Sequence, residues 1–413
     1  MHAPRPMLTV QQALDLMLAA PRPPAATEIV ATLGANGRVL AEAQASTINV
    51  PSADNTQMDG YAVRAADCAG GNATLTVTQR IAAGQVGQFL APGNAARIFT
   101  GALIPEGADA VVMQEQCDSA PPNMVTIKHA PKPGEWIRRA GEDIVAGSVI
   151  LAAGTRLRSQ ELGLAASVGL ASLPVFRKLR VAVFFTGDEL TMPGEAPGGQ
   201  LPPGAIYNSN RFTLRALVEN LGCTLTDFGI VPDTLEATRA TLRRAAKEND
   251  LIITSGGVSV GEEDHIKPAV EAEGQLNMWQ IAVKPGKPLA FGEVRRDGGS
   301  AYFIGLPGNP VSSFITFLLF VRPFILRQQG VTGPVAPRGY PMRADFHWPK
   351  ADRRNEFLRV RINDMGGLEL FPNQGSGVLT STVWGDGLVD NPAGHPIAQG
   401  ETVRFIPFSD ILY

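Results

Sequence analysis

The strongest constraint on the fold is an alternation of buried strands and amphipathic helices between residues 179 and 329. The apolar run Val181–Phe185 is typical of a buried strand. Capping patterns then predict a helix from Asn210 to Leu221 and a second helix that is opened by Asp233 and Glu236 and ends near Lys247. Strands are expected near 228–231, between these two helices, and at 251–254, after the second. Strands that alternate with helices form a parallel sheet with right-handed crossovers. We therefore predict an α/β domain here.

Polar loops follow four of the strands expected in this region. They are TGDEL at 186–190, SGGVSVGEEDH at 255–265, KPGKP at 284–288 and LPGNP at 306–310, with further strands near 278–283, 289–291 and 301–304 and a helix from about 311. Ligands of such sheets bind at the carboxyl ends of the strands. We therefore expect the four loops to converge on one crevice.

The remainder of the chain is predicted to be rich in short strands. The sequence contains 44 Gly and 32 Pro, and these punctuate short apolar runs in 27–178 and 340–413. Helices are expected only at 9–20, where Thr9 and Gln12 have capping-box spacing, and at 159–166. The expected units are an N-terminal helix in 1–26, a connecting domain in 27–45 and 148–178, a β-rich insertion in 46–147, the α/β domain in 179–329, and a C-terminal β-barrel in 330–413 that follows a linker at 330–339.

Charge and cysteine usage exclude several classes of protein. The net charge of −3 and the pI near 6.0 do not suggest a nucleic-acid or membrane surface. The three cysteines are scattered, as in proteins of reducing compartments, and have no zinc-ligand spacing. The first residues lack a signal-peptide core, and the apolar stretch 314–321 is too short to span a bilayer. We expect a cytoplasmic protein that binds neither nucleic acid nor membrane.

The loop at 255–265 allows three chemical interpretations. Gly257–Gly261 fits the G-x-S-x-G elbow of serine hydrolases, with Ser259 as nucleophile, although three carboxylates directly after the elbow oppose an oxyanion. The backbone N–H groups of Gly256 and Gly257 could hold a phosphate. The acids Glu262, Glu263 and Asp264 could hold a metal, although lone loop acids are usually solvated.

The crevice as a whole favours a magnesium–phosphate substrate. Asp188 and Glu189 add negative charge, and Lys284 and Lys287 add positive charge on a loop stiffened by two prolines. Carboxylates hold a hard cation, while lysines and backbone N–H groups hold phosphate oxygens. Each residue has a plainer interpretation; Asp233, for example, could serve only as a helix cap. Dinucleotide and P-loop fingerprints are absent from the sequence.

An ordered series of motifs resembles the molybdopterin molybdenumtransferase family, which includes the E domain of gephyrin. The motifs are PSADNTQMDGYAVRAAD, RIFTGALIPEGADAVVMQE, IRRAGEDIVAG, TGDEL, YNSN, SGGVSVGEEDH, KPGKPLAFG, GLPGNPVSS, RRNEFLRV and QGSGVLTS. They cover nearly the whole chain. The resemblance implies a transferase that inserts molybdate into adenylylated molybdopterin with magnesium-dependent release of AMP, the last step of molybdenum cofactor biosynthesis.

The resemblance also implies site residues. Those matching the family's catalytic positions are Asp59, Thr100, Asp143, Glu189, Asp233, Asp264, Lys284, Arg354 and Ser376. The expected substrate-binding residues are Ser255, Gly256, Gly257, Lys287, Pro307, Gly308 and Asn309, and the expected magnesium ligands are Asp264 and Glu189. The family is an elongated homodimer with a site at the subunit interface, and its α/β domain resembles molybdopterin adenylyltransferase. A contact with that adenylyltransferase is a further expectation.

One position departs from the family pattern, and several functions compete. Many members carry a basic residue four positions before Lys284, where this chain has Gln280, so weaker oxyanion affinity is expected. A tungstate-preferring paralogue is chemically closest to the main prediction. Adenylyl transfer is disfavoured because the adenylyltransferases are single-domain proteins. A non-catalytic scaffold is disfavoured because it has no need of a charged crevice.

Overall fold

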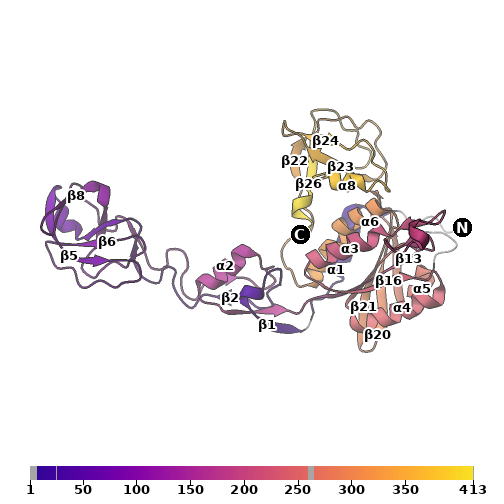
Figure 1. Cartoon of the computed structure of the whole chain (residues 1–413), viewed down its shortest axis with the longest axis horizontal. Coiled ribbons are helices and arrows are strands. Elements are labelled where there is room, and N and C mark those ends of the chain that lie inside the picture. The colour runs from indigo at the N-terminus through magenta and orange to yellow at the C-terminus, as the bar shows by residue number, and fades with distance from the viewer. Residues whose placement is uncertain (1–6, 25, 259–264, 413) are drawn as a thin grey trace.

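The computed structural model describes residues 7–24, 26–258 and 265–412. The molecule is elongated, with its parts strung along one long axis (Figure 1). A β-rich unit lies at one end, a small connecting unit lies in the middle, and the α/β unit lies at the other end beside the C-terminal sheet. The residue boundaries of these units stay a prediction.

The α/β unit is built on a six-stranded mixed sheet. Its strand order is β16 (Thr224–Val231), β13 (Arg180–Thr186), β17 (Leu251–Ser255), β21 (Gly299–Leu306), β20 (Pro288–Arg296) and β18 (Gly274–Gln280). The first four strands are parallel, whereas β20 and β18 are antiparallel. The predicted parallel sheet is therefore confirmed for four strands, and two antiparallel strands extend it at one edge. The turn at Asp297 and Gly298 is too short for a crossover and can join only antiparallel strands.

Helices cover both faces of this sheet. One apolar core joins the sheet to α1 (Val10–Ala19), α3 (Ser209–Asn220) and the long helical run of α6 (Pro310–Thr316), a π-helical turn (Phe317–Val321) and α7 (Arg322–Gln328). A second core joins the opposite face to α4 (Leu235–Glu248) and α5 (Ile266–Glu273). Within the described part of the chain, the run Pro310–Gln328 is long and apolar enough to cross a membrane, but 83% of it is buried, as in a core helix.

Two predicted helix caps are wrong by one or two residues, with consequences for the site. Helix α3 is capped by Asn208, whose side chain accepts from Arg211 N, and not by Asn210. Helix α4 is capped by Thr234, whose hydroxyl accepts from Ala237 N, and not by Asp233. Asn210 and Asp233, which were predicted to be caps, line the cavity described below.

The C-terminal sheet includes a strand from the α/β region. Its order is β19 (Val283–Lys284), β23 (Asn355–Ile362), β25 (Gly387–Asn391), β26 (Thr402–Pro407) and β22 (Tyr340–Arg343), with β24 (Leu368–Leu370) beside β23 and α8 (Thr380–Trp384) nearby. Because β19 is part of the KPGKP loop, this loop is attached to both units. The closure of the C-terminal sheet into a barrel stays a prediction.

The other two units are β-rich, as predicted. The insertion has a sheet of β7 (Ala110–Met113), β4 (Gly60–Val63), β6 (Asn94–Ile98), β5 (Ala73–Ile81), β9 (Met124–Ile127) and β8 (Cys117–Ala120), and a pair of β3 (Asn55–Thr56) with β10 (Ile137–Arg138). The connecting unit pairs β1 (Thr27–Ala31) with β12 (Ser172–Phe176) and β2 (Gln44–Ala45) with β11 (Val149–Leu151), and contains α2 (Ser159–Ser167). A short pair of β14 (Leu190–Thr191) and β15 (Ile206–Tyr207) flanks the α/β sheet.

Candidate active site

The four predicted loops line one cavity of about 750 Å³ at the carboxyl ends of the parallel strands. The convergence expected from the sequence is therefore confirmed. Twelve of the predicted site residues line this cavity, namely Glu189, Asp233, Ser255, Gly256, Gly257, Lys284, Lys287, Pro307, Gly308, Asn309, Arg354 and Ser376. Arg354 and Ser376 come from the C-terminal unit, so the cavity lies between two units of one subunit.

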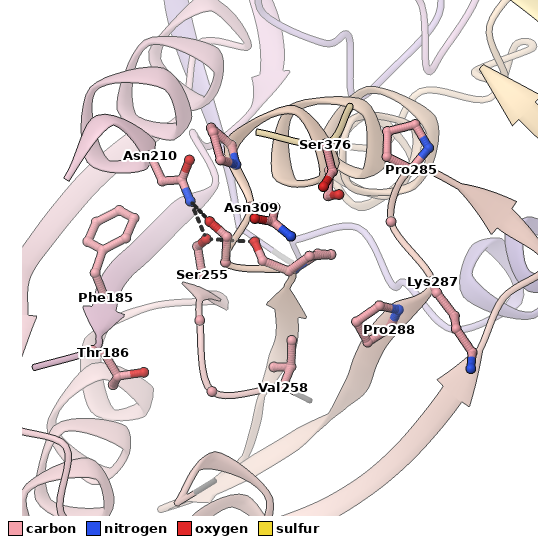
Figure 2. Close-up of a pocket in the computed structure, with 18 of the residues that line it drawn as sticks. Phe185, Thr186, Asn210, Ser255, Val258, Pro285, Lys287, Pro288, Asn309 and Ser376 are labelled. Atoms are coloured by element: carbon pink, nitrogen blue, oxygen red, sulfur yellow. Dashed lines mark hydrogen bonds between the residues drawn. The ribbon is translucent and has the colours of Figure 1, made fainter. Parts of the chain in front are cut away.

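A hydrogen-bond network fixes the loops on one side of the cavity (Figure 2). The Asn210 side-chain amide donates to Ser255 Oγ at 2.8 Å and to Gly308 O at 2.7 Å. Ser255 Oγ in turn donates to Pro307 O at 3.0 Å. The network ties the ends of β17 and β21 to helix α3. The Ser255 hydroxyl is therefore already engaged in holding the LPGNP loop, and its role is at least partly structural.

Gly256 is required by the backbone at the end of β17. Its φ of +101° lies in a region that favours glycine, and a Cβ at this position would lie 2.6 Å from Thr186 O. The Gly256 N–H donates to Leu306 O at 3.1 Å. This N–H is therefore not available to a phosphate, contrary to the sequence-based interpretation. Gly257 also has a positive φ, of +61°.

Three cationic side chains also line the cavity. Lys284 Nζ lies 3.0 Å from Glu356 Oε1 and 3.3 Å from Asp352 Oδ2. Arg354 donates to both oxygens of Asp352, each at 2.9 Å. Lys287 is exposed and, within the described residues, takes part in no ion pair. The side chain of Lys287 can thus turn toward an anion without breaking an ion pair.

Two described carboxylates line the cavity, and they suit a hydrated magnesium ion. Glu189 and Asp233 are both lining residues, whereas Asp264 lies outside the described residues together with Ser259, Glu262 and Glu263. Among described residues, no group of three or more His, Cys, Asp or Glu side chains could enclose a metal. Mg²⁺ commonly uses one or two carboxylates, several waters and substrate phosphates. The buried Thr186 Oγ1 of the same cavity, which has no hydrogen-bond partner among the described residues, is a further oxygen beside this site.

Three predicted site residues are not among those lining the cavity of the same subunit. Asp59 directly precedes β4 and Thr100 follows β6, so both belong to the β-rich insertion at the other end of the molecule (Figure 1). Asp143 lies between β10 and β11, which connect the insertion to the connecting unit. Asp59 Oδ1 accepts from both Thr100 N and Thr100 Oγ1 at 2.8 Å. These hydrogen bonds, and the nearby charge of Arg97, lower the pKa of Asp59 below its ordinary value. Asp59 and Thr100 therefore form a preorganised, exposed carboxylate that is separate from the cavity.

The sequence interpretation missed several polar residues of the cavity or beside it. Asn208, Asn210 and Gln374 are lining residues, and Glu356 is the buried partner of Lys284. Asn208 and Asn210 lie in the YNSN motif, and Glu356 lies in RNEF, so both motifs carried a signal. Gln374 begins the QGSG motif that contains Ser376, so this motif carried a signal as well.

The structure does not support a role for Gln280 in this cavity. Gln280 is exposed at the end of the edge strand β18 and is not a lining residue. An exposed charge outside the cavity is screened by solvent and salt. We therefore expect Gln280→Lys to change the half-saturating molybdate concentration by less than about threefold, which is under 1 kcal/mol. Titrating molybdate against both proteins at two ionic strengths checks this, and a gain of tenfold or more would contradict it.

Comparison with known proteins accounts for almost the whole chain. Residues 8–169 match the MoeA N-terminal region (domain I and II), residues 182–327 match a probable molybdopterin binding domain, and residues 341–408 match the MoeA C-terminal region (domain IV). The molybdopterin molybdenumtransferase of Haemophilus influenzae is 41% identical over 98% of this chain and 100% of its own length.

More distant relatives extend the comparison to eukaryotes and to solved structures. Gephyrin of Dictyostelium discoideum is 34% identical over 71% of this chain and 46% of its own length. The crystal structure of the molybdopterin biosynthesis moeA protein of Pyrococcus horikoshii superposes with a TM-score of 0.84, at 28% identity, over 97% of this chain and 100% of that one. The chain therefore belongs to the molybdopterin molybdenumtransferase family.

Proposed function

We propose that the chain transfers molybdenum from molybdate to adenylylated molybdopterin, with release of AMP, as the last step of molybdenum cofactor biosynthesis. In this reaction the phosphoanhydride is hydrolysed, AMP leaves, and the dithiolene sulfurs of molybdopterin bind the metal. The observation that carries the proposal is the cavity, which is lined both by the cations Lys284, Lys287 and Arg354 and by the acids Glu189 and Asp233. A small oxyanion and a nucleotide phosphate need cations, and a divalent ion needs carboxylates.

The chain's own residues divide this work between them. Lys284, Lys287 and Arg354 would hold the oxyanion and the phosphate oxygens, and Ser376 lines the same cavity from the C-terminal loop. The backbone of this loop is docked on helix α6, because Val311 N donates to Ser376 O at 3.0 Å. Glu189 and Asp233, together with Asp264, would hold Mg²⁺. When bound, Mg²⁺ supplies positive charge that neutralises the phosphate oxygens as the leaving AMP gains negative charge.

We further propose that the active unit is a homodimer with a site shared between subunits. Asp59, Thr100 and Asp143 match the motifs of the family's site, yet none of them lines the cavity of its own subunit, and Asp59 and Thr100 lie at the opposite end of that subunit. A second copy of the chain can bring its own β-rich insertion to the cavity. The pair of Asp59 and Thr100 is suited to this role because it is preorganised within the insertion itself.

The proposed substrate also indicates a cellular compartment and a partner protein. We place it in the cytoplasm and propose that it receives the adenylylated substrate by contact with the molybdopterin adenylyltransferase. Neither nucleic acid nor a membrane is required. Tungstate is close to molybdate in size and charge, so a tungstate-preferring enzyme is the second candidate; metal analysis of the product after incubation with both oxyanions distinguishes the two.

The release of AMP from adenylylated molybdopterin tests the proposed function directly. We expect release to require magnesium, and we expect molybdenum to be present in the product only when molybdate is added. Unchanged substrate under all conditions, with folded and dimeric protein, would refute the proposal. Magnesium-dependent release of AMP with no metal in the product would reduce the activity to that of a hydrolase.

A further inference from the structure

We propose that Glu356 is a positioning residue, which acts with Asp352 to hold the Lys284 ammonium at the edge of the cavity and so sets its affinity for an oxyanion. The proposal rests on the proposed function, in which Lys284 contacts the oxyanion. Neither acid lines the cavity. Both belong to the C-terminal unit, whereas Lys284 belongs to the KPGKP loop. The acids therefore connect the affinity of the cavity to the docking of the C-terminal sheet.

The carboxylate of Glu356 is fully committed. The residue is 1% exposed, and Oε1 lies 3.0 Å from Lys284 Nζ. Oε2 accepts from Trp348 Nε1 at 2.8 Å and from Asp352 N at 3.2 Å. A buried carboxylate is costly unless it is both paired and hydrogen-bonded. Two donors from the C-terminal unit thus fix the carboxylate, and its other oxygen is left to fix Lys284.

Asp352 connects Lys284 to the second cation of the cavity. Its Oδ2 lies 3.3 Å from Lys284 Nζ and 2.9 Å from Arg354 Nη2. Its Oδ1 accepts from Arg354 Nε at 2.9 Å and from Arg354 N at 3.0 Å. The hydrogen bonds from Arg354 hold the pKa of Asp352 far below its usual range, so the group stays a carboxylate. One acid therefore fixes the spacing of the ammonium and the guanidinium that line the cavity.

The backbone of Lys284 is fixed independently of these acids. Strand β19 pairs with β23 so that Lys284 lies opposite Glu356, and Asn355 N donates to Ala282 O at 2.9 Å. On the other side Ala282 N donates to Leu8 O at 2.8 Å. A lysine side chain nevertheless keeps several rotatable bonds, and fixing them costs conformational entropy. The acids remove this freedom before an oxyanion arrives, which is the role of a positioning residue.

A double-mutant cycle between Glu356→Gln and Lys284→Met separates positioning from a merely structural role. The amide of Gln cannot accept from Trp348 and Asp352 and also accept from Lys284, so it loses one of these contacts. We expect Glu356→Gln to raise the half-saturating molybdate concentration about tenfold, with a smaller change in kcat. If Glu356 acts through Lys284, the double variant should match Lys284→Met alone. If the losses of the two single variants multiply in the double variant, the two residues act independently and the proposal is overturned.

Two further variants guard against misfolding and nonspecific charge effects. Trp348→Phe removes the N–H that holds Glu356 but leaves the ion pair in place, so we expect a rise of about twofold to threefold in the same constant. Glu369→Gln removes a partly exposed acid that pairs with Arg361 in the same unit and does not line the cavity, and it should change nothing. Thermal unfolding is measured for every variant. An unchanged constant in both Glu356→Gln and Trp348→Phe, with folded protein, would refute positioning.

Failure of the proposed function gives a different result. If Lys284→Met alone binds molybdate and releases AMP as the unchanged chain does, then the cavity is not the oxyanion site, and the proposed function fails at this residue. If Lys284→Met is defective but Glu356→Gln is not, the proposed function survives and only the positioning role fails.

Discussion

Replacing Lys284 by Met is expected to lower kcat/KM for molybdenum insertion by about a hundredfold to a thousandfold. Removal of one preorganised donor to a developing anion has an effect of this size in other enzymes. Lys284 lies at the edge of the cavity and is already held by Glu356 and Asp352. Methionine keeps the length and apolar stem of the side chain but removes the ammonium. Steady-state rates of AMP release at varied molybdate measure the effect.

A matched control for this change is Lys267→Met. Lys267 is an exposed lysine on helix α5 of the same unit and does not line the cavity. We expect its kinetic constants to stay within about twofold of the unchanged chain, since surface substitutions away from a site have small effects. Comparable losses in the two variants would mean that overall charge, and not the position of Lys284, controls the rate.

Replacing Asp59 by Asn is expected to lower the rate of AMP release by about a hundredfold or more, although Asp59 lies at the far end of its own subunit. The amide keeps the shape of the side chain and can still accept from Thr100. It removes the negative charge that the partner's insertion would bring to the shared site. The unfolding temperature should change little, because the side chain is exposed.

Asp118→Asn is the control for Asp59→Asn. Asp118 is an exposed carboxylate on β8 of the insertion sheet, 2.7 Å from Lys128 Nζ. It lies outside the family motifs. Its loss should leave the rate unchanged because exposed pairs contribute little. A rate for Asp59→Asn that equals the control would show that the insertion plays no part in catalysis.

The sequence predicted the α/β region best where strand and helix signals agree. The apolar run Val181–Phe185 lies within β13, and the four polar strand-end loops do meet in one cavity. Such loops are readable because parallel strands carry their ends to a common edge. The antiparallel direction of the edge pair β18 and β20 was not predicted, because apolar runs give the position of a strand but not its direction.

The finer errors share a physical cause, which is competition between neighbouring polar residues. Asn208 and Asn210 are both good caps, and so are Asp233 and Thr234, so local preference alone cannot choose between them. Tertiary contacts decide, since Asn210 is drawn to Ser255 and Gly308. The role of Gly256 N–H was misjudged for the same reason, because its acceptor Leu306 O lies fifty residues along the chain.

Contacts between distant units were beyond sequence reasoning. The pairing of Lys284 with Glu356 joins residues 72 positions apart across two units. No periodicity within either segment encodes it. The distance of Asp59 from the cavity likewise appears only once the elongated arrangement is known (Figure 1).

Mixing two inactive variants tests most directly whether the cavity of one subunit is completed by the insertion of its partner. Asp59→Asn chains and Lys284→Met chains are allowed to exchange subunits at a 1:1 ratio, with exchange verified by mass spectrometry. Random pairing makes half of the dimers mixed, and each mixed dimer has one intact site of two, so AMP release should recover to about a quarter of the unchanged rate. No recovery despite proven exchange would place both residues in one subunit's site and contradict the shared-site account.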